Sequence, residues 1–147
     1  MVFTSYFANI PKLIEAGFDP ATELCGIVRK RPFWLRREVR NVPALAPSEW
    51  LLETYKAGKI DEGVYTACYR GGLEKLNVKD TIATIKSIGL KVFLCYEAPD
   101  KFCHRHLFAD WLTAGGLDCK EWTPERWKAL QNPRLASVPI GAPVPLF

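Results

Sequence analysis

The sequence contains no long hydrophobic run. No apolar stretch approaches the roughly 20 residues that a membrane-spanning helix needs, and the first residues lack the features of a secretory signal. Internal repeats and low-complexity segments are also missing, which excludes a solenoid. We therefore expect a soluble, cytoplasmic protein that does not contact a membrane.

The chain also carries little excess charge. Its 20 Lys and Arg residues face 16 Asp and Glu residues, for a net charge of +4, and 48% of its residues are hydrophobic. This composition excludes disorder for most of the chain. A chain of 147 residues can bury about two thirds of its surface around one core. We expect one domain over residues 1–131 and an extended, proline-rich tail over residues 132–147. The charge permits phosphate-bearing partners without requiring them.

Cysteines are few and odd in number, so a disulfide scaffold is not expected. The five are Cys25, Cys68, Cys95, Cys103 and Cys119. A domain of this size folds without covalent cross-links. We therefore predict five reduced thiols.

Short apolar runs alternate with segments of helical periodicity along the chain. The expected strands are residues 2–7, 24–28, 91–96 and 117–122. The expected helices are residues 47–58, 61–76, 77–89 and 103–114, with Ser48 and Asn77 as N-caps. A strand, a loop, a helix and a further strand form a βαβ unit, which favours a parallel sheet. The sequence therefore predicts an α/β fold, a single three-layer domain with a mostly parallel sheet and helices on both faces.

The richest chemistry lies in the loop between the strand at 91–96 and the helix at 103–114. The candidate catalytic residues are His104, Cys103, Cys95 and Glu97, and the neighbouring candidate ligand-binding residues are Tyr96 and Arg105. In an open parallel sheet, the loops that leave the carboxyl ends of the strands line the ligand crevice. The helix that starts here also offers free N–H groups and a positive dipole end to an anion.

Several interpretations of this loop compete. A thiol nucleophile would use Cys95 or Cys103, with His104 as its base. A phosphatase-like cradle needs an arginine where the chain has Lys101, and Glu97 would repel the phosphate. A metal site would recruit the cysteines and the histidine, but no fourth ligand is evident, so we assign no metal-binding residue. The loop would otherwise form an anion or nucleotide pocket, or its cysteines would be inert core thiols.

A second feature is the segment RKRPFWLRREVR, residues 29–40, in which six of twelve residues are basic. Its cations can hold phosphates while Trp34 stacks on a base, or the segment is a solvated loop. Because Arg29 directly follows an expected parallel strand, we place it at the crevice. The first strand ends near Tyr6 and Asn9, and Asn9 either caps a short helix or faces the same crevice.

These motifs resemble a known family. The element FLCYEAPDKFCHRHL, the SYFAN opening, the GIVRKRPFW segment and the stretch LAPSEWLLETYKAGKIDEGVYTACY are similar to domain-of-unknown-function family 488. The resemblance spans roughly residues 3–115. It implies a compact α/β domain found in bacteria, archaea and their viruses, with no established reaction. The candidate site residues that match its motifs are Tyr6, Asn9, Arg29, Pro32, Cys95, Glu97, Cys103, His104 and Arg105.

We therefore expect a small α/β protein that binds a phosphorylated nucleotide-like ligand in a crevice at the carboxyl ends of the strands. Arg29 and Arg105 would neutralise phosphate, and Glu97 and Asn9 would contact sugar or base groups. Two alternatives stay open. One is a nucleic-acid-binding protein that uses the basic segment, and the other is a thiol- or metal-dependent enzyme that uses the loop cysteines and the histidine. The residues identify no cofactor and leave open whether a reaction is catalysed.

Overall fold

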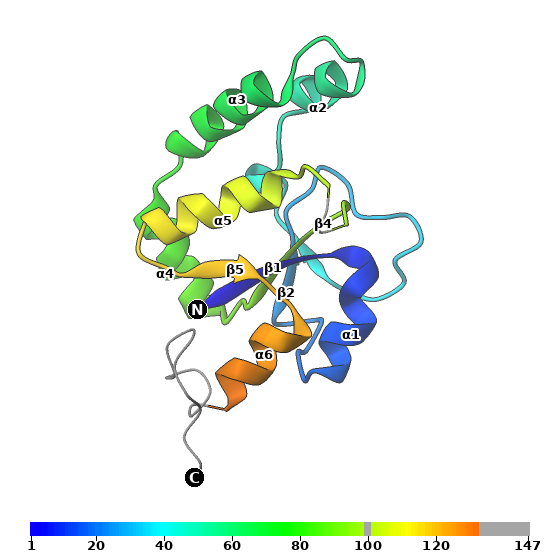
Figure 1. Cartoon of the computed structure of the whole chain (residues 1–147), viewed down its shortest axis with the longest axis vertical. Helices are drawn as coiled ribbons and strands as arrows, with labels where there is room; N and C mark the ends of the chain where they lie inside the picture. The colour runs from blue at the N-terminus through cyan, green and yellow to red at the C-terminus, as the bar shows by residue number, and fades with distance from the viewer. Residues whose placement is uncertain (99–100, 133–147) are drawn as a thin grey trace, which may run out of the picture.

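The protein is built on a parallel β-sheet (Figure 1). The structure, a computed structural model, describes residues 1–98 and 101–132. Within these residues, five strands are ordered β3-β2-β4-β1-β5, and every neighbouring pair is parallel. The strands are β1 (Val2–Tyr6), β2 (Leu24–Gly26), β3 (Arg40–Asn41), β4 (Val92–Cys95) and β5 (Cys119–Glu121). The predicted α/β fold is confirmed.

Helices cover both faces of the sheet and complete three layers (Figure 1). One face carries α4 (Val78–Ile88) and α5 (His104–Ala114), and the other carries α1 (Ile10–Glu15) and α6 (Pro124–Gln131). On the first side, α3 (Glu62–Glu74) packs on α5, and α2 (Glu49–Lys56) packs on α3. Two 3-10 helices, η1 (Phe7–Asn9) and η2 (Pro43–Leu45), lie in connections. In β4, Phe93 joins one core, and Val92 and Leu94 join the other. A strand covered on both faces is apolar throughout, which explains the uninterrupted apolar run at this point.

Local sequence signals set the helix boundaries. The Ser48 hydroxyl accepts a hydrogen bond from the Leu51 N–H (3.1 Å), and the Asn77 side chain accepts one from the Asp80 N–H (3.0 Å). Both predicted N-caps are thus confirmed. Gly89 ends α4 with a φ of 86°, a conformation that residues with a Cβ rarely adopt.

Some elements differ from the prediction. Two elements were not predicted. The strand β3 has only two residues, and the helix α6 buries no residue and so lacks an apolar stripe. Phe7, expected to end the first strand, begins a 3-10 helix. Of the predicted tail, residues 133–147 lie outside the described residues. In the part of the chain that the structure describes, no helix is long and apolar enough to cross a membrane.

A close approach of side chains fixes the carboxyl end of β2. Asn41 accepts a hydrogen bond from the Val28 N–H (3.2 Å) and donates one to the Val28 carbonyl (2.9 Å). A Cβ at Gly26 would stand 2.5 Å from the Asn41 Oδ1 atom and 2.9 Å from the Phe7 Cζ atom. Because two hydrogen bonds hold Asn41, it cannot move aside without losing them. Only glycine at position 26 leaves room for this arrangement.

We predict that Gly26→Ala lowers the free energy of unfolding by about 1–3 kcal/mol, because the added methyl group overpacks the site. The matched control is Gly71→Ala in α3, where a Cβ meets no atom within 4 Å. There alanine should raise stability by about 0.5–1 kcal/mol through its higher helix propensity. Urea unfolding of both variants measures the difference, and equal stabilities would contradict the prediction.

Candidate functional site

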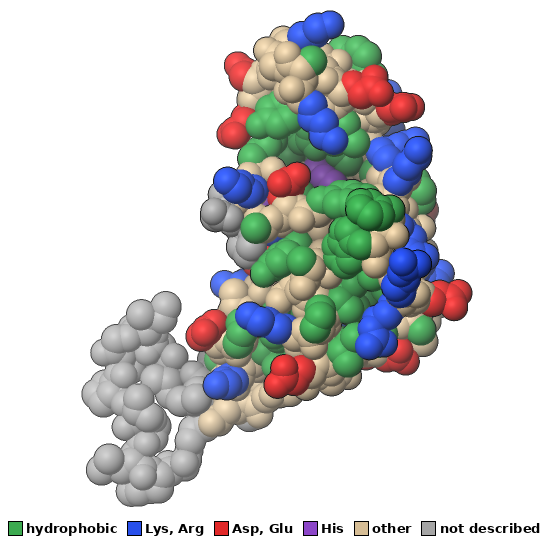
Figure 2. All heavy atoms as spheres, turned by 90° about the vertical axis from the view of Figure 1, so that its right-hand side faces the viewer, with side chains coloured by type: hydrophobic (Ala, Val, Ile, Leu, Met, Phe, Trp, Pro, Cys, Tyr) green, Lys and Arg blue, Asp and Glu red, His purple; other side chains and the backbone are tan. Residues whose placement is uncertain are grey.

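A cleft of about 720 Å³ opens at the carboxyl ends of β2 and β4. The loops that follow these strands contribute Val28, Arg29, Lys30, Tyr96, Glu97 and Phe102, and the start of α5 contributes Cys103 and His104. The opposite wall consists of Pro47, Glu49, Leu52, Glu53, Tyr55, Lys56 and Tyr65. In Figure 2, a histidine side chain is visible below the upper end of the molecule, which α2 and α3 form.

The sheet topology explains why distant residues meet here. β2 and β4 are adjacent and parallel, with Gly26 paired to Leu94, so their carboxyl ends lie at the same edge. Five predicted site residues line the cleft: Arg29, Tyr96, Glu97, Cys103 and His104. The structure therefore brings these five residues together at one cleft, whereas Cys95 and Arg105, which were expected in the same crevice, do not line it.

The wall formed by α2 and α3 is aromatic. The rings of Tyr55, Tyr65 and Phe102 pack against each other, with centroid separations of 5.1 to 5.7 Å. Burial raises the pKa of the Tyr55 and Tyr65 phenols, so both keep their protons at neutral pH. The wall therefore offers apolar ring surface with hydroxyl groups that can donate hydrogen bonds.

Charges of opposite sign lie on different sides of the cleft. Arg29 and Lys30 are exposed at the end of β2, while Glu49 and Glu53 extend from α2. The Tyr96 hydroxyl donates a hydrogen bond to the Lys30 carbonyl, which ties the cationic rim to the end of β4. The α2 wall also carries Lys56 beside its two carboxylates, so the paired cations of the rim next to β2 are the more favourable place for an anionic group.

His104 sits at the cleft floor, buried as its place at the start of the apolar stripe predicts. Its Nε2 atom lies 2.6 Å from the Ile27 carbonyl oxygen, which can only accept, so this nitrogen carries the proton. Burial lowers the pKa of the imidazole to about 4. The Nδ1 atom is then a free acceptor at neutral pH, and it lies 3.8 Å from the Cys103 sulfur. With a pKa this low the nitrogen is a weak base, and at neutral pH it accepts hydrogen bonds without taking up a proton.

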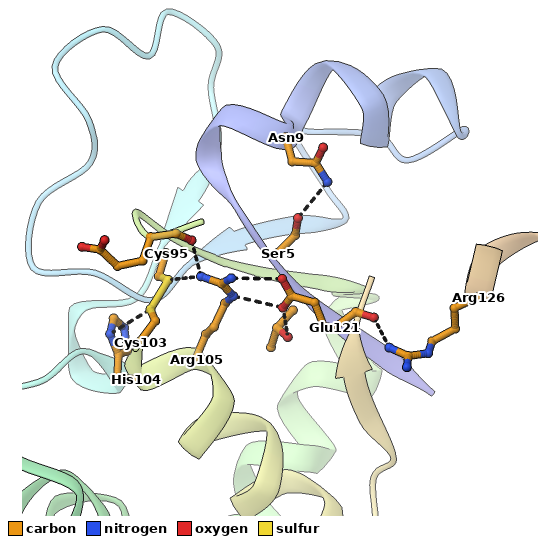
Figure 3. Close-up of polar contacts among 10 residues, drawn as sticks. Ser5, Asn9, Cys95, Cys103, His104, Arg105, Glu121 and Arg126 are labelled. Carbon is orange, nitrogen blue, oxygen red and sulfur yellow. Dashed lines mark hydrogen bonds and ion pairs between the residues drawn. A yellow bond between two sulfur atoms is a disulfide. The ribbon is translucent and has the colours of Figure 1, made fainter. Parts of the chain in front are cut away.

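The cysteines correct the prediction of five reduced thiols. The structure joins Cys95, at the end of β4, to Cys103, at the N-cap of α5, by a disulfide (Figure 3). The end of β4 and the start of α5 bring the two sulfur atoms together. Cys25, Cys68 and Cys119 are free, and burial raises the pKa of Cys25 and Cys119 to about 12. Cys68 is exposed and lies outside the apolar stripe of α3.

Arg105 does not line the cleft. It is 0% exposed, and its guanidinium donates to both carboxylate oxygens of Glu121 at 3.0 Å (Figure 3). The same group donates to the Cys95 sulfur (2.8 Å) and to the Glu97 carbonyl. The expected contact of Arg105 with phosphate is therefore not supported by its position, because its donors already have partners inside the protein.

The remaining predicted site residues do not line the cleft. Tyr6 lies beneath the guanidinium, whose carbon is 5.8 Å from the ring centre, and Asn9 is buried and donates to Ser5 (3.1 Å). Pro32 is buried, whereas Trp34 is 47% exposed beside the cationic rim. The structure thus brings neither Tyr6 nor Asn9 to the cleft surface.

Several lining residues escaped the sequence analysis. Tyr55 and Tyr65 are not among the predicted site residues, since aromatic residues at helical spacing usually belong to a packed core. A usable signal was present in α2, where Glu49, Leu52, Glu53 and Lys56 follow the i, i+3, i+4, i+7 pattern of a single helix face. Polar residues on such a face indicate a wall that contacts solvent or a ligand. Within the described residues, no group of three or more His, Cys, Asp or Glu side chains is arranged to hold a metal ion.

Fold and site together define a parallel α/β domain with an open, mixed-charge cleft at the carboxyl ends of its strands. The family model DUF488-N3a, described as the active DUF488-N3 subclade, matches residues 19–116. The chain therefore belongs to the DUF488 family, and the resemblance drawn from its motifs is confirmed. The matched range includes every residue that lines the cleft. No curated protein and no solved structure shows significant similarity to the chain.

We predict that Glu121→Gln lowers the free energy of unfolding by about 3–5 kcal/mol, because it leaves the buried Arg105 charge without its counterion. Glu125→Gln, an exposed change in the first turn of α6, is the control and should change stability by no more than about 0.5 kcal/mol. Urea unfolding at neutral pH measures both. Similar stabilities for the two variants would show that the ion pair does not stabilise the fold.

A separate prediction concerns pH. The folded protein resists protonation of His104 down to about pH 4, whereas the unfolded chain takes up that proton near pH 6.5. Stability from this group is therefore complete above pH 6.5 and is lost as pH falls toward 4, by on the order of 3 kcal/mol. Urea unfolding across this range should show a flatter profile for His104→Gln. His106→Gln, whose imidazole pKa is also lowered by burial, should flatten it less. An unchanged slope in His104→Gln would refute the assignment.

Proposed function

We propose that the protein binds a phosphorylated nucleotide-like ligand in the cleft at the ends of β2 and β4. The observation that carries the proposal is the pairing of an aromatic wall with an exposed Arg29–Lys30 rim in one cleft. A planar base suits the ring surface, and a phosphate suits paired cations. The volume of about 720 Å³ is within the usual range of small-molecule sites.

The carboxylates of the cleft support one orientation of this ligand. Glu49, Glu53 and Glu97 would repel a phosphate placed among them, but they accept hydrogen bonds from amino and hydroxyl groups. The base and sugar therefore lie against the tyrosines and carboxylates, and the phosphate lies at Arg29 and Lys30. This arrangement replaces Arg105 with Lys30 as the second cationic contact.

A second candidate function is thiol-dependent chemistry on the bound ligand. The observation that favours it is the 3.8 Å separation of the Cys103 sulfur and the unprotonated His104 nitrogen at the cleft floor. With the disulfide reduced, His104 Nδ1 would accept a hydrogen bond from the Cys103 thiol and take its proton only as the sulfur attacks the ligand.

We predict that Arg29→Ala and Lys30→Ala each weaken the binding of a nucleoside 5′-monophosphate by about 1.5–3 kcal/mol, or roughly tenfold to a hundredfold, because each removes a charge-assisted contact. Isothermal titration calorimetry with the four common nucleoside monophosphates, with and without reductant, measures the affinities. Arg70→Ala, an exposed change on α3 outside the cleft, is the control and should bind as the wild type does.

The same titrations separate the two candidate functions. Cys103→Ser should keep its affinity for the nucleotide, because the phosphate requires no thiolate, and it should lose any conversion of the nucleotide detected by mass spectrometry. Unchanged affinity in both rim variants would overturn the proposed phosphate contact.

A further inference from the structure

A loop that starts at the rim of the cleft carries several cations and, in its middle, two exposed aromatic rings. In residues 29–37, here called the basic loop, five side chains are cationic and none is acidic. All five are exposed: Arg29, Lys30, Arg31, Arg36 and Arg37. Between them Phe33 is 95% exposed and Trp34 is 47% exposed. Figure 2 shows hydrophobic side chains on this side of the molecule with Lys and Arg side chains close by.

The basic loop is anchored at both ends. Val28 and Val39, which flank it, are buried, and Asn41 holds Val28 by two hydrogen bonds. Within the loop, Leu35 donates its N–H to the Pro32 carbonyl (3.1 Å), and Arg31 donates to the Arg37 carbonyl. The aromatic side chains at the turn therefore project outward from a folded segment.

The loop is continuous with the cleft, since its first two residues form the cationic rim. One phosphate at this rim uses Arg29 and Lys30 and leaves the three other cations without an anion. Glu38 is the next residue, and no ion pair within the described residues engages a loop cation. Cations on both sides of a pair of exposed rings are complementary to a single strand, whose phosphates can contact the cations while an unpaired base stacks on a ring.

We infer that the cleft receives one nucleotide of a single-stranded nucleic acid, whose neighbouring nucleotides bind along the basic loop. Their phosphates contact Arg31, Arg36 and Arg37, and a neighbouring base stacks on Phe33 or Trp34. This inference rests on the proposed function, because the nucleotide in the cleft is the one that Arg29 and Lys30 hold. Duplex is disfavoured because its paired bases are not free to stack on the rings.

The test measures fluorescence anisotropy of a labelled single-stranded oligonucleotide of about 12 residues, in DNA and RNA forms. Phe33→Ala, and separately Arg36→Ala with Arg37→Ala, should weaken oligonucleotide binding by about tenfold or more and leave mononucleotide affinity unchanged. The double variant should also reduce the slope of log affinity against log salt by about 1.4, or about 0.7 for each lost phosphate contact. Arg70→Ala with Lys75→Ala, two exposed cations on and just after α3, is the charge-matched control.

The outcomes separate the two proposals. If mononucleotides bind but the loop variants hold the oligonucleotide as tightly as wild type does, this inference fails and the proposed function stands. If no mononucleotide binds and Arg29→Ala leaves oligonucleotide affinity unchanged, the proposed function fails and the inference fails with it. Binding of phosphatidylserine vesicles through the same loop residues, without oligonucleotide binding, would make the loop a lipid-binding surface and overturn the inference. Because Phe33 is 95% exposed, its replacement should leave the urea midpoint unchanged, so a loss of binding reports a lost contact.

Discussion

The arrangement around the cleft depends on one buried cation, the guanidinium of Arg105. Moving such a group out of water costs several kcal/mol, and the cost is met only when its donors are satisfied and its charge is paired. Glu121 on β5 supplies the charge and also accepts a hydrogen bond from Thr4 on β1 at 2.8 Å. The Cys95 sulfur and the Glu97 carbonyl are the other hydrogen-bond acceptors of the guanidinium. One side chain of α5 thereby connects the carboxyl ends of β1, β4 and β5.

This connection has a direct consequence for the cleft. Cys103 and His104 immediately precede Arg105, so the anchor that fixes the first turn of α5 also fixes the cleft floor. The Glu97 carbonyl faces the guanidinium while its residue lines the cleft, which couples the floor to the loop after β4. Arg105 is thus a positioning residue beneath the site. A change there acts on the fold and on the site together, whereas Arg29 and Lys30 can change without disturbing the core.

The sequence predicts the fold well because its signals are local or follow from topology. Arg29 and Glu97, which follow β2 and β4, meet because right-handed crossovers place the carboxyl ends of parallel strands at the same edge of the sheet. This placement does not depend on the side chains. The direction in which the Arg105 side chain points does not follow from the residues next to it in the sequence. The residue after His104 on a helix can face the sheet or solvent, and the choice depends on Glu121, 16 positions away on a strand. Tyr55 and Tyr65 were missed for a similar reason, since the same periodicity describes a core face and a cleft wall. The pairing of Cys95 with Cys103 depends on how α5 is placed against β4, which their spacing in the sequence does not determine.

The distribution of charge gives the cleft a direction. At neutral pH, burial keeps His104 uncharged, so the floor adds no positive charge of its own. Arg105 lies beneath the floor and is paired with Glu121, and its charge helps to keep the imidazole of His104 unprotonated by lowering its pKa. The cations next to β2 therefore face carboxylates on α2 across an aromatic wall. The rim carries two adjacent cations, whereas Lys56 on the α2 wall stands beside Glu49 and Glu53. A ligand that carries an anion at one end and hydrogen-bond donors at the other is therefore favoured with its anion toward the basic loop and its donors toward the α2 carboxylates.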